Sequence, residues 1–269
     1  MHTIDNSSHP SVYNYFRIFG LHVSTPPFGA SASIIHDLTK QKHASYVCVV
    51  NTHVAIETIR CENYRRIIQQ SDLTLPDGMP IVWYAKNILG LSAVEKVSGP
   101  DLMKKCFTDL SGLKHFFFGS TRDTLSKIKS CAKIEGLNLN IVGSYSPPFR
   151  PLTHGERQHV IAMINELAPD IIWVALGAPK QEYWMHEFKN HLDRGVMVGV
   201  GAAFDYFVGN IHRPPAWLIR AGLEWLCRLI QEPGRLWRRY FISNSFFLFL
   251  VLKEIILLHI FKKRKKSND

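Results

Sequence analysis

The sequence predicts an α/β protein with a Rossmann-like, mostly parallel sheet flanked by helices. Along residues 1–211, short apolar runs alternate with longer segments of helical periodicity, a pattern typical of a doubly wound sheet. The chain has 269 residues, of which 46% are hydrophobic and 20% are charged. A chain of this length and composition buries a normal core and is not disordered as a whole.

Seven strands are predicted from the short apolar runs. In chain order they are Phe16–Val23, Tyr46–Asn51, Leu73–Leu75, His115–Phe118, Asn140–Gly143, Ile171–Leu176 and Val196–Val200. The helical segments between them are Val54–Gln70, Pro80–Leu89, Asp101–Leu110, Arg122–Glu135, Thr153–Leu167 and Gln181–Leu192. Ligands of such sheets bind beyond the carboxyl ends of the strands, so the loops there are the expected place of the chemistry.

The C-terminal part of the chain differs in pattern and in charge. From Ala216 onward the pattern is helical, with a break near Pro233, and no further strand is predicted. Residues 212–269 hold 12 Lys and Arg against 4 Asp and Glu, whereas residues 1–211 hold 20 against 18. We therefore predict an α/β domain at 1–211 and an all-helical, membrane-associating appendage at 212–269. Nucleic acid, anionic lipid and phosphorylated ligands are the ordinary partners of such a basic segment.

Residues 241–261 are strongly apolar, and the basic cluster Lys262–Lys266 follows them. The length permits a membrane span, but Lys253 and Glu254 near its centre would each cost roughly 2.5–3.5 kcal/mol there. A helix on the membrane surface fits better, with residues 241–266 on anionic lipid at about 1 kcal/mol per lysine. A true span and a helix buried in the monomer or in an oligomer interface are the alternatives. The apolar run disfavours nucleic acid, whose binding tails are usually polar.

Several kinds of chemistry lack their sequence motifs. The five cysteines are scattered without a Cys-x-x-Cys pair, which argues against a disulfide framework and a zinc ribbon. The first residues show no secretory pattern, so a reduced, cytoplasmic protein is expected. There is no Asp-x-Asp, His-Glu-x-x-His, Gly-x-Ser-x-Gly or Walker P-loop, and the 13 histidines show no metal spacing. Neither a metal nor another cofactor is expected.

Four polar residues lie at or after the ends of predicted strands. Asp77 stands at a strand-to-helix turn, as a general base or, as the position alone favours, a helix cap. Gln181 follows a Gly-Ala-Pro turn and is placed either to bind a sugar hydroxyl or to form an ordinary turn. Asp205 ends a Gly-x-Gly-x-x-Phe stretch without the third glycine of a dinucleotide fingerprint, and it binds a ligand or caps a helix. Asn51 suits a ligand or a turn.

Three arginines of the appendage have helical spacing. Arg228, Arg235 and Arg238 share one face if their helix is continuous, because seven residues return to nearly the same angle and ten fall within about 80° of it. Such a face fits a diphosphate, since guanidinium groups bind phosphate in a forked geometry. Pro233 interrupts the helix, and a solvated basic face or a lipid contact is the alternative.

Taken together, these segments resemble the WecG/TagA/CpsF glycosyltransferases over about residues 16–240. Besides Asn51, the matching stretches are SDLTLPDG at 71–78, VSGPDL at 97–102, LGAPKQE at 176–182, VGAAFD at 200–205, RPP at 213–215 and GLEWLCRLIQEP at 222–233. Such a series in this order is far more specific than any single loop. Val49 stands where the family usually has Thr, and Lys96 where it often has Arg; lysine keeps the charge but loses the forked geometry.

The resemblance implies an inverting, metal-independent transferase. Members move N-acetylmannosamine, its uronic acid or glucose from a UDP-sugar to a polyprenyl-diphosphate-linked sugar at the cytoplasmic membrane face, for cell-surface polysaccharides. The residues carried over are Asp77 as the base, Asn51, Gln181 and Asp205 as pocket residues, Lys96 in place of the family arginine, and Arg228, Arg235 and Arg238 as appendage arginines. The resemblance also implies membrane docking of the appendage and makes a homo-oligomer an expected assembly.

In the predicted mechanism, Asp77 accepts the proton of an acceptor hydroxyl that attacks the anomeric carbon opposite UDP. A base aligned in this way contributes about 10²–10⁴-fold, and the arginines neutralise the leaving diphosphate. A non-catalytic, membrane-bound nucleotide-sugar sensor or scaffold is the alternative, since Val49 and Lys96 depart from the family. A nucleic-acid-binding protein and a dinucleotide-dependent oxidoreductase have less support from the residues.

Overall fold

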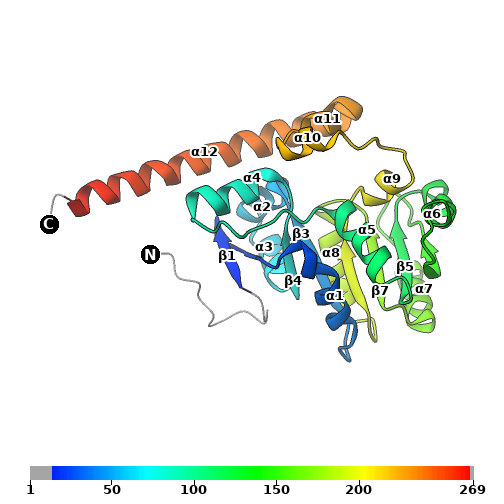
Figure 1. The fold of residues 1–269 in the computed structure, drawn as a ribbon. Coiled ribbons are helices and arrows are strands. Elements are labelled where there is room, and N and C mark those ends of the chain that lie inside the picture. The colour runs from blue at the N-terminus through cyan, green and yellow to red at the C-terminus, as the bar shows by residue number, and fades with distance from the viewer. Residues whose placement is uncertain (1–13, 267–269) are drawn as a thin grey trace.

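The computed structural model describes residues 14–266 of the chain, with side chains described from 14 to 260. The N-terminal residues on which the expectation of no leader rests lie outside this range, as do the side chains of the basic cluster at 262–266. Figure 1 shows a layered α/β body with a long C-terminal helix across one end.

A six-stranded parallel sheet forms the centre of the body, which confirms the predicted fold class. Its strand order is β4-β3-β8-β7-β5-β6, and each neighbouring pair runs parallel. The strands are β3 (Ser45–Val50), β4 (Leu73–Pro76), β5 (Lys114–Gly119), β6 (Asn140–Tyr145), β7 (Ile171–Ala175) and β8 (Val196–Gly199).

The first predicted strand, Phe16–Val23, is wrong, because the segment folds into a hairpin. Strands β1 (Tyr15–Ile18) and β2 (Leu21–Ser24) pair antiparallel in a sheet of their own. The turn between them places Phe19 at φ 50° and Gly20 at φ 83°, the left-handed backbone that a two-residue hairpin turn requires. The hairpin lies beside the edge strand β4, where the Ser24 N–H donates to Thr74 Oγ1 at 3.0 Å.

Helices connect the strands and cover both faces of the sheet. In the body they are the short 3₁₀ turn η1 (Phe28–Ala30), α1 (Ser31–Thr39), α2 (Thr52–Arg60), α3 (Glu62–Gln69), α4 (Met79–Trp83), the π-helical turn η2 (Tyr84–Ile88), α5 (Gly99–Asp109), α6 (Arg122–Ile134), α7 (His154–Leu167), α8 (Lys180–Lys189) and α9 (Ala203–Phe207). The predicted helix Val54–Gln70 is two helices, because Cys61 between them has extended backbone at φ −133° and ψ 105°. The predicted helix Pro80–Leu89 changes from α to π geometry at Tyr84.

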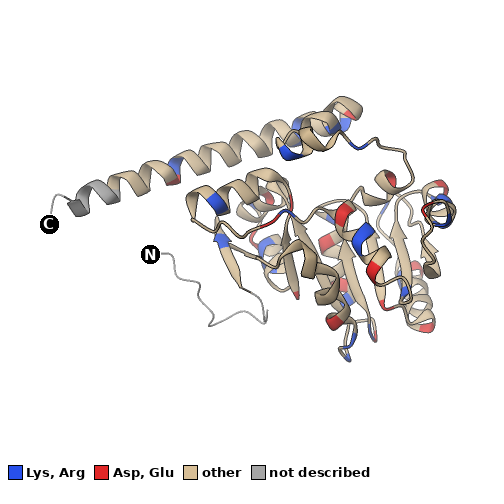
Figure 2. Ribbon diagram, in the orientation of Figure 1, with Lys and Arg blue, Asp and Glu red and all other residues tan. Residues whose placement is uncertain are grey.

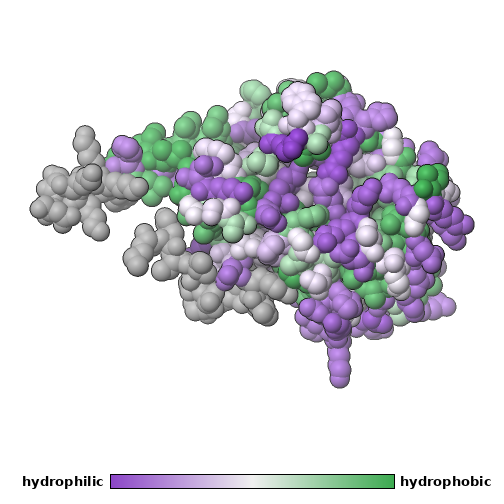
Figure 3. Space-filling model, in the orientation of Figure 1, coloured by the Kyte–Doolittle hydropathy of each residue, from purple (hydrophilic) through white to green (hydrophobic). Residues whose placement is uncertain are grey.

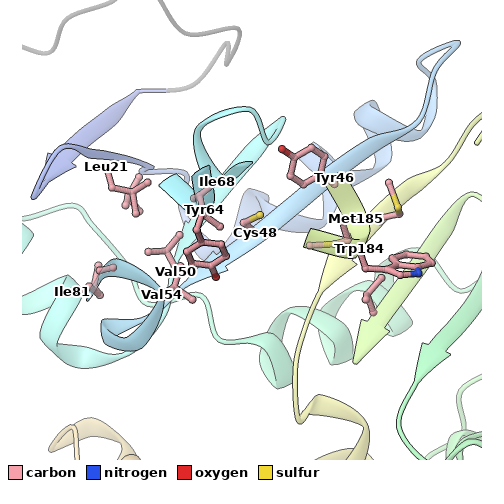
Figure 4. Close-up of a cluster of buried hydrophobic side chains, with 14 of the residues drawn as sticks. Leu21, Tyr46, Cys48, Val50, Val54, Tyr64, Ile68, Ile81, Trp184 and Met185 are labelled. Atoms are coloured by element: carbon pink, nitrogen blue, oxygen red, sulfur yellow. The ribbon is translucent and has the colours of Figure 1, made fainter. Parts of the chain in front are cut away.

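Two hydrophobic clusters lie on the two sides of the sheet. Alternate residues of β3 point to opposite faces, so that Tyr46, Cys48 and Val50 join one cluster and Val47 and Val49 join the other. Figure 4 shows the first cluster, in which the labelled side chains of β3 meet those of helices α2, α3 and α8. Helices α1, α5, α6 and α9 supply buried residues to the second cluster. The rigid, two-sided core fixes the strand ends from which the candidate site is built.

Three helices follow the body, and no described residue after β8 is in a strand. They are α10 (Ala216–Arg220), α11 (Glu224–Gln231) and α12 (Pro233–Lys266). Leu236, Ser243, Phe247 and Val251 of α12 are buried. The last two belong to the hydrophobic cluster of the body, and the Phe247 ring packs edge-on against Phe19 at 5.5 Å between centroids. Figure 2 shows that charged residues gather around α10, α11 and the start of α12, whereas most of the following coloured part of α12 is uncharged.

Candidate active site

A pocket lies beyond the carboxyl ends of four neighbouring strands, β4, β3, β8 and β7. Asp77 follows β4, Asn51 follows β3, Gly201 follows β8 and Gly177 follows β7, and all four residues line the pocket. Residues of α10, α11 and α12 line the opposite side. The parallel sheet therefore supplies one wall of the pocket, and the appendage supplies the other.

Asp77 is half-buried in this pocket at the turn between β4 and α4. Its backbone N–H donates to the Val50 carbonyl of β3 at 2.8 Å, which fixes the turn to the neighbouring strand. The helix-cap interpretation of Asp77 is wrong, because the residue at the cap position of α4 is Gly78, and no side chain caps that helix. Gly78 has φ +82°, a backbone conformation that a residue with a Cβ adopts only under strain.

Burial raises the pKa of the Asp77 carboxyl to about 6. The charge of Lys96 lowers this pKa, whereas the negative charges of Glu224 and Asp101 raise it. A carboxyl with this pKa is ionised near neutral pH and is still basic enough to take a proton, which is the condition for a general base.

Lys96 and Glu224 form an ion pair between the body and the appendage. The Lys96 Nζ lies 2.6 Å from Glu224 Oε2, and the two side chains are only 14% and 20% exposed. A second ion pair joins the same two parts, with Arg213 Nη2 at 2.6 Å from Asp101 Oδ2 at the start of α5. Both pairs lie in or directly beside segments that the sequence singled out, which are 97–102, 213–215 and 222–233, so these segments hold the appendage over the pocket.

Gly222 brings the appendage backbone close to the loop that carries Asp77. It has φ +76°, and a Cβ at this position would lie 2.9 Å from the Cβ of Met79. Glycine is therefore required there for two reasons, the left-handed backbone and the close approach.

Gln181 lines the pocket, but its amide is bonded to the protein. Its Nε2 donates to Glu182 Oε1 at 2.7 Å, and its Oε1 accepts from the Gly201 N–H at 3.1 Å. Glu182 is fully buried and also accepts from the Tyr64 hydroxyl at 3.0 Å, and burial raises its pKa to about 7. Gln181 therefore fixes the loop after β8, and one amide N–H remains for a ligand.

Asn51 lines the pocket and also caps a helix. Its Oδ1 accepts from the Val54 N–H at 3.1 Å at the start of α2, which is the turn role that the sequence left open. The Nδ2 amide remains for a ligand. Val49, two residues earlier, is buried and lines the same pocket, so the departure from the family threonine places a methyl group where a hydroxyl is usual.

Asp205 is not brought together with Asp77. It lies outside the pocket lining, and its Oδ1 accepts from Asn210 Nδ2 at 3.1 Å and from Thr124 Oγ1 at 3.4 Å. The cap of α9 is Ala202, without a side-chain hydrogen bond. Asp205 thus joins α9 to α6, a role that neither sequence interpretation described.

The three predicted arginines do not share one face of a continuous helix. Glu232, with φ −132° and ψ 56°, separates α11 from α12. Arg228 and Arg235 line the pocket, and both pair with this Glu232, Arg228 Nη2 at 3.1 Å and Arg235 Nη2 at 2.5 Å. Arg238 is exposed and lies outside the pocket lining. The break at Pro233 changes which arginines face the pocket.

Comparison with known proteins agrees with this geometry. The glycosyl transferase WecG/TagA/CpsF family matches residues 16–259, which includes every segment that lines the pocket. The chain belongs to this family. It is a glycosyltransferase of the hexosyl or N-acetylhexosaminyl type.

Two relatives in this family carry the same enzyme name. The N-acetylglucosaminyldiphosphoundecaprenol N-acetyl-beta-D-mannosaminyltransferase of Bacillus subtilis (strain 168) is 32% identical over 216 residues, covering 80% of this chain and 81% of the relative. The enzyme of the same name from Bacillus spizizenii (strain ATCC 23059 / NRRL B-14472 / W23) is 29% identical over 201 residues, covering 74% of this chain and 76% of the relative.

The pocket lining also includes residues of this glycosyltransferase that sequence reasoning did not predict as site residues, among them His53, Glu224 and Arg239. The signal for Arg239 is the spacing of the buried residues of α12. At 100° per residue around the helix axis, the direction of Arg239 differs from that of the buried Leu236 by about 60°, whereas the direction of Arg238 differs by about 160°. This buried face of α12 can be recognised in the sequence only once the helix is known to begin at Pro233.

The described side chains contain no group of three or more His, Cys, Asp or Glu that could hold a metal ion. The cationic groups that line the pocket are Lys96, Arg228, Arg235 and Arg239.

Proposed function

We propose that this glycosyltransferase inverts the anomeric carbon while it transfers a sugar from a UDP-sugar to a polyprenyl-diphosphate-linked acceptor in the assembly of a cell-surface polysaccharide. The transferred sugar is of the N-acetylmannosamine type, its uronic acid, or glucose. The names of the two Bacillus relatives make N-acetylmannosamine the first sugar to test and N-acetylglucosaminyl-diphosphoundecaprenol the first acceptor.

The observation that carries this proposal is the position of Asp77 opposite the cationic side chains. Asp77 lies at one wall of the pocket, at the end of β4, and Arg228 and Arg235 line the wall formed by the appendage. A base on one side and guanidinium groups on the other fit a displacement in which nucleophile and leaving group lie on opposite faces of the sugar.

In the proposed reaction, the Asp77 carboxylate accepts the proton of the acceptor hydroxyl. The hydroxyl oxygen forms a bond to the anomeric carbon, and the bond from that carbon to the UDP oxygen breaks, with its electron pair passing to the diphosphate. Arg228 and Arg235 stabilise the charge that develops on the diphosphate. Lys96, although paired with Glu224, adds positive charge to the same pocket. This step requires no metal ion.

We propose further that the enzyme is peripheral to the cytoplasmic face of the membrane, with α12 on the membrane surface. Residues 233–260 are long and apolar enough to span a bilayer, and only 17% of their most apolar window is buried. Two observations favour a surface position. Glu254 accepts a hydrogen bond from the Tyr84 hydroxyl of η2 at 2.8 Å, and Ser243 lies 3.1 Å from His53 of α2. These contacts hold α12 along the body, while its opposite side is apolar and exposed (Figure 3).

Release of UDP tests the proposed activity. Detergent-solubilised protein is incubated with N-acetylglucosaminyl-diphosphoundecaprenol, a panel of UDP-sugars and EDTA. We expect UDP release with one donor, unchanged by EDTA, and a product of inverted anomeric configuration. UDP binding without release across the panel, also with other lipid-linked acceptors, would instead support a non-catalytic nucleotide-sugar-binding scaffold.

A further inference from the structure

Glu182 is a fully buried carboxyl group beside a residue of the pocket lining, and the proposed reaction does not use it. It lies in the first turn of α8, directly after Gln181. A buried carboxyl group costs free energy that an apolar residue of the same size would avoid. A group of this kind next to a site is typical of one that orients a functional side chain.

The two oxygens of the Glu182 carboxyl group accept hydrogen bonds from different parts of the molecule. Oε1 accepts from Gln181 Nε2 at 2.7 Å, and Oε2 accepts from the Tyr64 hydroxyl at 3.0 Å. Tyr64 comes from α3, is buried among the core side chains of Figure 4, and stacks on Tyr183 with 5.6 Å between the ring centroids. The core therefore holds one oxygen of Glu182, and the other oxygen faces the pocket residue.

The contacts of Gln181 define which way its amide group points. Its Nε2 donates to Glu182, and its Oε1 accepts from the Gly201 N–H at 3.1 Å. Rotation of the amide by 180° would bring its oxygen against the Glu182 oxygen and its NH₂ group against the Gly201 N–H, so two hydrogen bonds would become two repulsive contacts. A Cβ at Gly199 would lie 3.0 Å from Gln181 Nε2, so the amide also packs closely on β8.

We propose that Glu182 is a positioning residue that fixes the amide of Gln181, so that the second N–H of this amide donates to an oxygen of a substrate sugar. Gln181 then presents a donor and not an acceptor to the pocket. The group that it recognises is therefore an acceptor oxygen, such as that of a hydroxyl or of an acetamido carbonyl. The proposal rests on the proposed function only for the identity of this sugar, which belongs either to the nucleotide-sugar donor or to the lipid-linked acceptor.

The bond from Gln181 forms with either protonation state of Glu182. Burial raises the pKa of Glu182 to about 7, so both states occur near neutral pH. A proton on Oε2 would be donated to the Tyr64 oxygen, and Oε1 would still accept from Gln181. Glu182→Gln can form the same two bonds, because its NH₂ group donates to Tyr64 and its oxygen accepts from Gln181. Glu182→Met has a side chain of similar length and can form neither.

A double-mutant cycle on kcat/KM tests whether Glu182 acts through Gln181. The full-length protein in detergent is compared with Gln181→Met, Glu182→Met and the double variant. We expect each single change to lower kcat/KM at least tenfold, and the double variant to lie within twofold of Gln181→Met. Glu182→Gln is expected to stay within threefold of the wild type.

Tyr64→Phe is the matched control for the buried network. It removes one bond of the same carboxyl group but leaves Gln181 its acceptor, so kcat/KM is expected to change by less than threefold. Urea unfolding of every variant measures the accompanying loss of stability. An equal loss of kcat/KM in folded Tyr64→Phe and Glu182→Met would overturn the proposal, as would full kcat/KM in Glu182→Met. Losses that multiply in the double variant would overturn it too, because they would show that Glu182 acts independently of Gln181.

Binding and KM identify the sugar that Gln181 contacts. Calorimetric titration compares each UDP-sugar of the panel with UDP. Weaker binding of the UDP-sugar to Glu182→Met, with UDP binding unchanged and a higher KM for the donor, assigns the oxygen to the donor sugar. A higher KM for the acceptor alone assigns it to the acceptor sugar.

A wild type that transfers no sugar would count against the proposed function, and the same cycle would then be measured on the binding of the UDP-sugar. A loss in Glu182→Met that is absent from Tyr64→Phe and is not increased in the double variant would support the positioning role even then. Equal affinity of the wild type and Glu182→Met would overturn that role as well.

Discussion

The Lys96 ammonium group lies 2.6 Å from the carboxylate of Glu224, and this ion pair joins the two walls of the pocket. Lys96 comes from the body and Glu224 from the start of α11, and both influence the pKa of Asp77 in opposite directions. The position of the appendage and the basicity of the proposed catalytic base are therefore linked. If α11 moves, the charges that surround Asp77 change.

Asp77→Asn is expected to lower kcat by about 10²–10⁴-fold while UDP binding is kept, because the amide cannot take the proton. In the wild type, log kcat/KM is expected to rise with pH up to about 6, the pKa of Asp77, and to level above it, because only the carboxylate is active. Initial rates of UDP release from pH 5 to 8 measure both effects. Asp123→Asn on the surface of α6 serves as the control, and full turnover in a folded, UDP-binding Asp77→Asn would contradict the assignment.

Glu224→Gln is expected to shift the acidic limb of the pH profile to lower pH. Glu224 raises the pKa of Asp77 and Lys96 lowers it, and the amide removes the first effect while it can still accept a hydrogen bond from Lys96. Glu135→Gln, at an ion pair with Lys104 on the body surface, is the matched control and should leave the profile in place. An acidic limb that moves to higher pH, or does not move, would show that Glu224 does not act on the base.

In the wild type, the free energy of unfolding is expected to decrease as pH rises from 4.5 to about 7, and Glu182→Gln is expected to make this decrease smaller. Because burial raises the pKa of Glu182 from 4.5 to about 7, the folded state keeps a proton that the unfolded chain loses in this interval. Wild-type stability therefore falls as pH rises through it. Urea unfolding at a series of pH values measures how the free energy of unfolding changes with pH. The pKa of Asp77 is also raised, but Asp77 is present in both proteins, so its contribution cancels in the difference between them. Glu166→Gln, exposed on α7, is the control; parallel slopes for the wild type and Glu182→Gln would refute this account.

Phe249→Gln and Ile256→Gln are each expected to weaken binding to anionic phospholipid vesicles by about tenfold or more. Both side chains are exposed on the outer face of α12, and burial of such a side chain contributes about 1.5–3 kcal/mol. Ile134→Gln is the control, since Ile134 is 85% exposed on α6 of the body. Co-sedimentation with vesicles measures the binding, which should also weaken at high salt because of the lysines at 262–266. Equal losses in all three variants would argue against a specific role of α12.

The strand-to-helix turns were predictable from the sequence because they are local. Asp77, Asn51 and Gln181 each follow a short apolar run, and parallel strands bring such positions to one edge of the sheet. Asp205 follows a strand in the same way, yet α9 turns its side chain toward Thr124 and Asn210. Beyond the first turn of the helix that follows a strand, the direction of a side chain depends on which other helix packs beside it. The residue pattern of the strand and turn does not contain that information.

The sequence by itself determined the fold class, the family and the charge of the appendage, since each of these depends on residue types and their order along the chain. Only the tertiary structure decided that Arg239 rather than Arg238 faces the pocket, and that Glu224 lies against Lys96. The physical reason is that both facts depend on the rotation and position of helices packed onto a distant part of the chain. The burial of Leu236, Ser243 and Phe247 sets that rotation, and a change of one residue in register turns a helical side chain by about 100°.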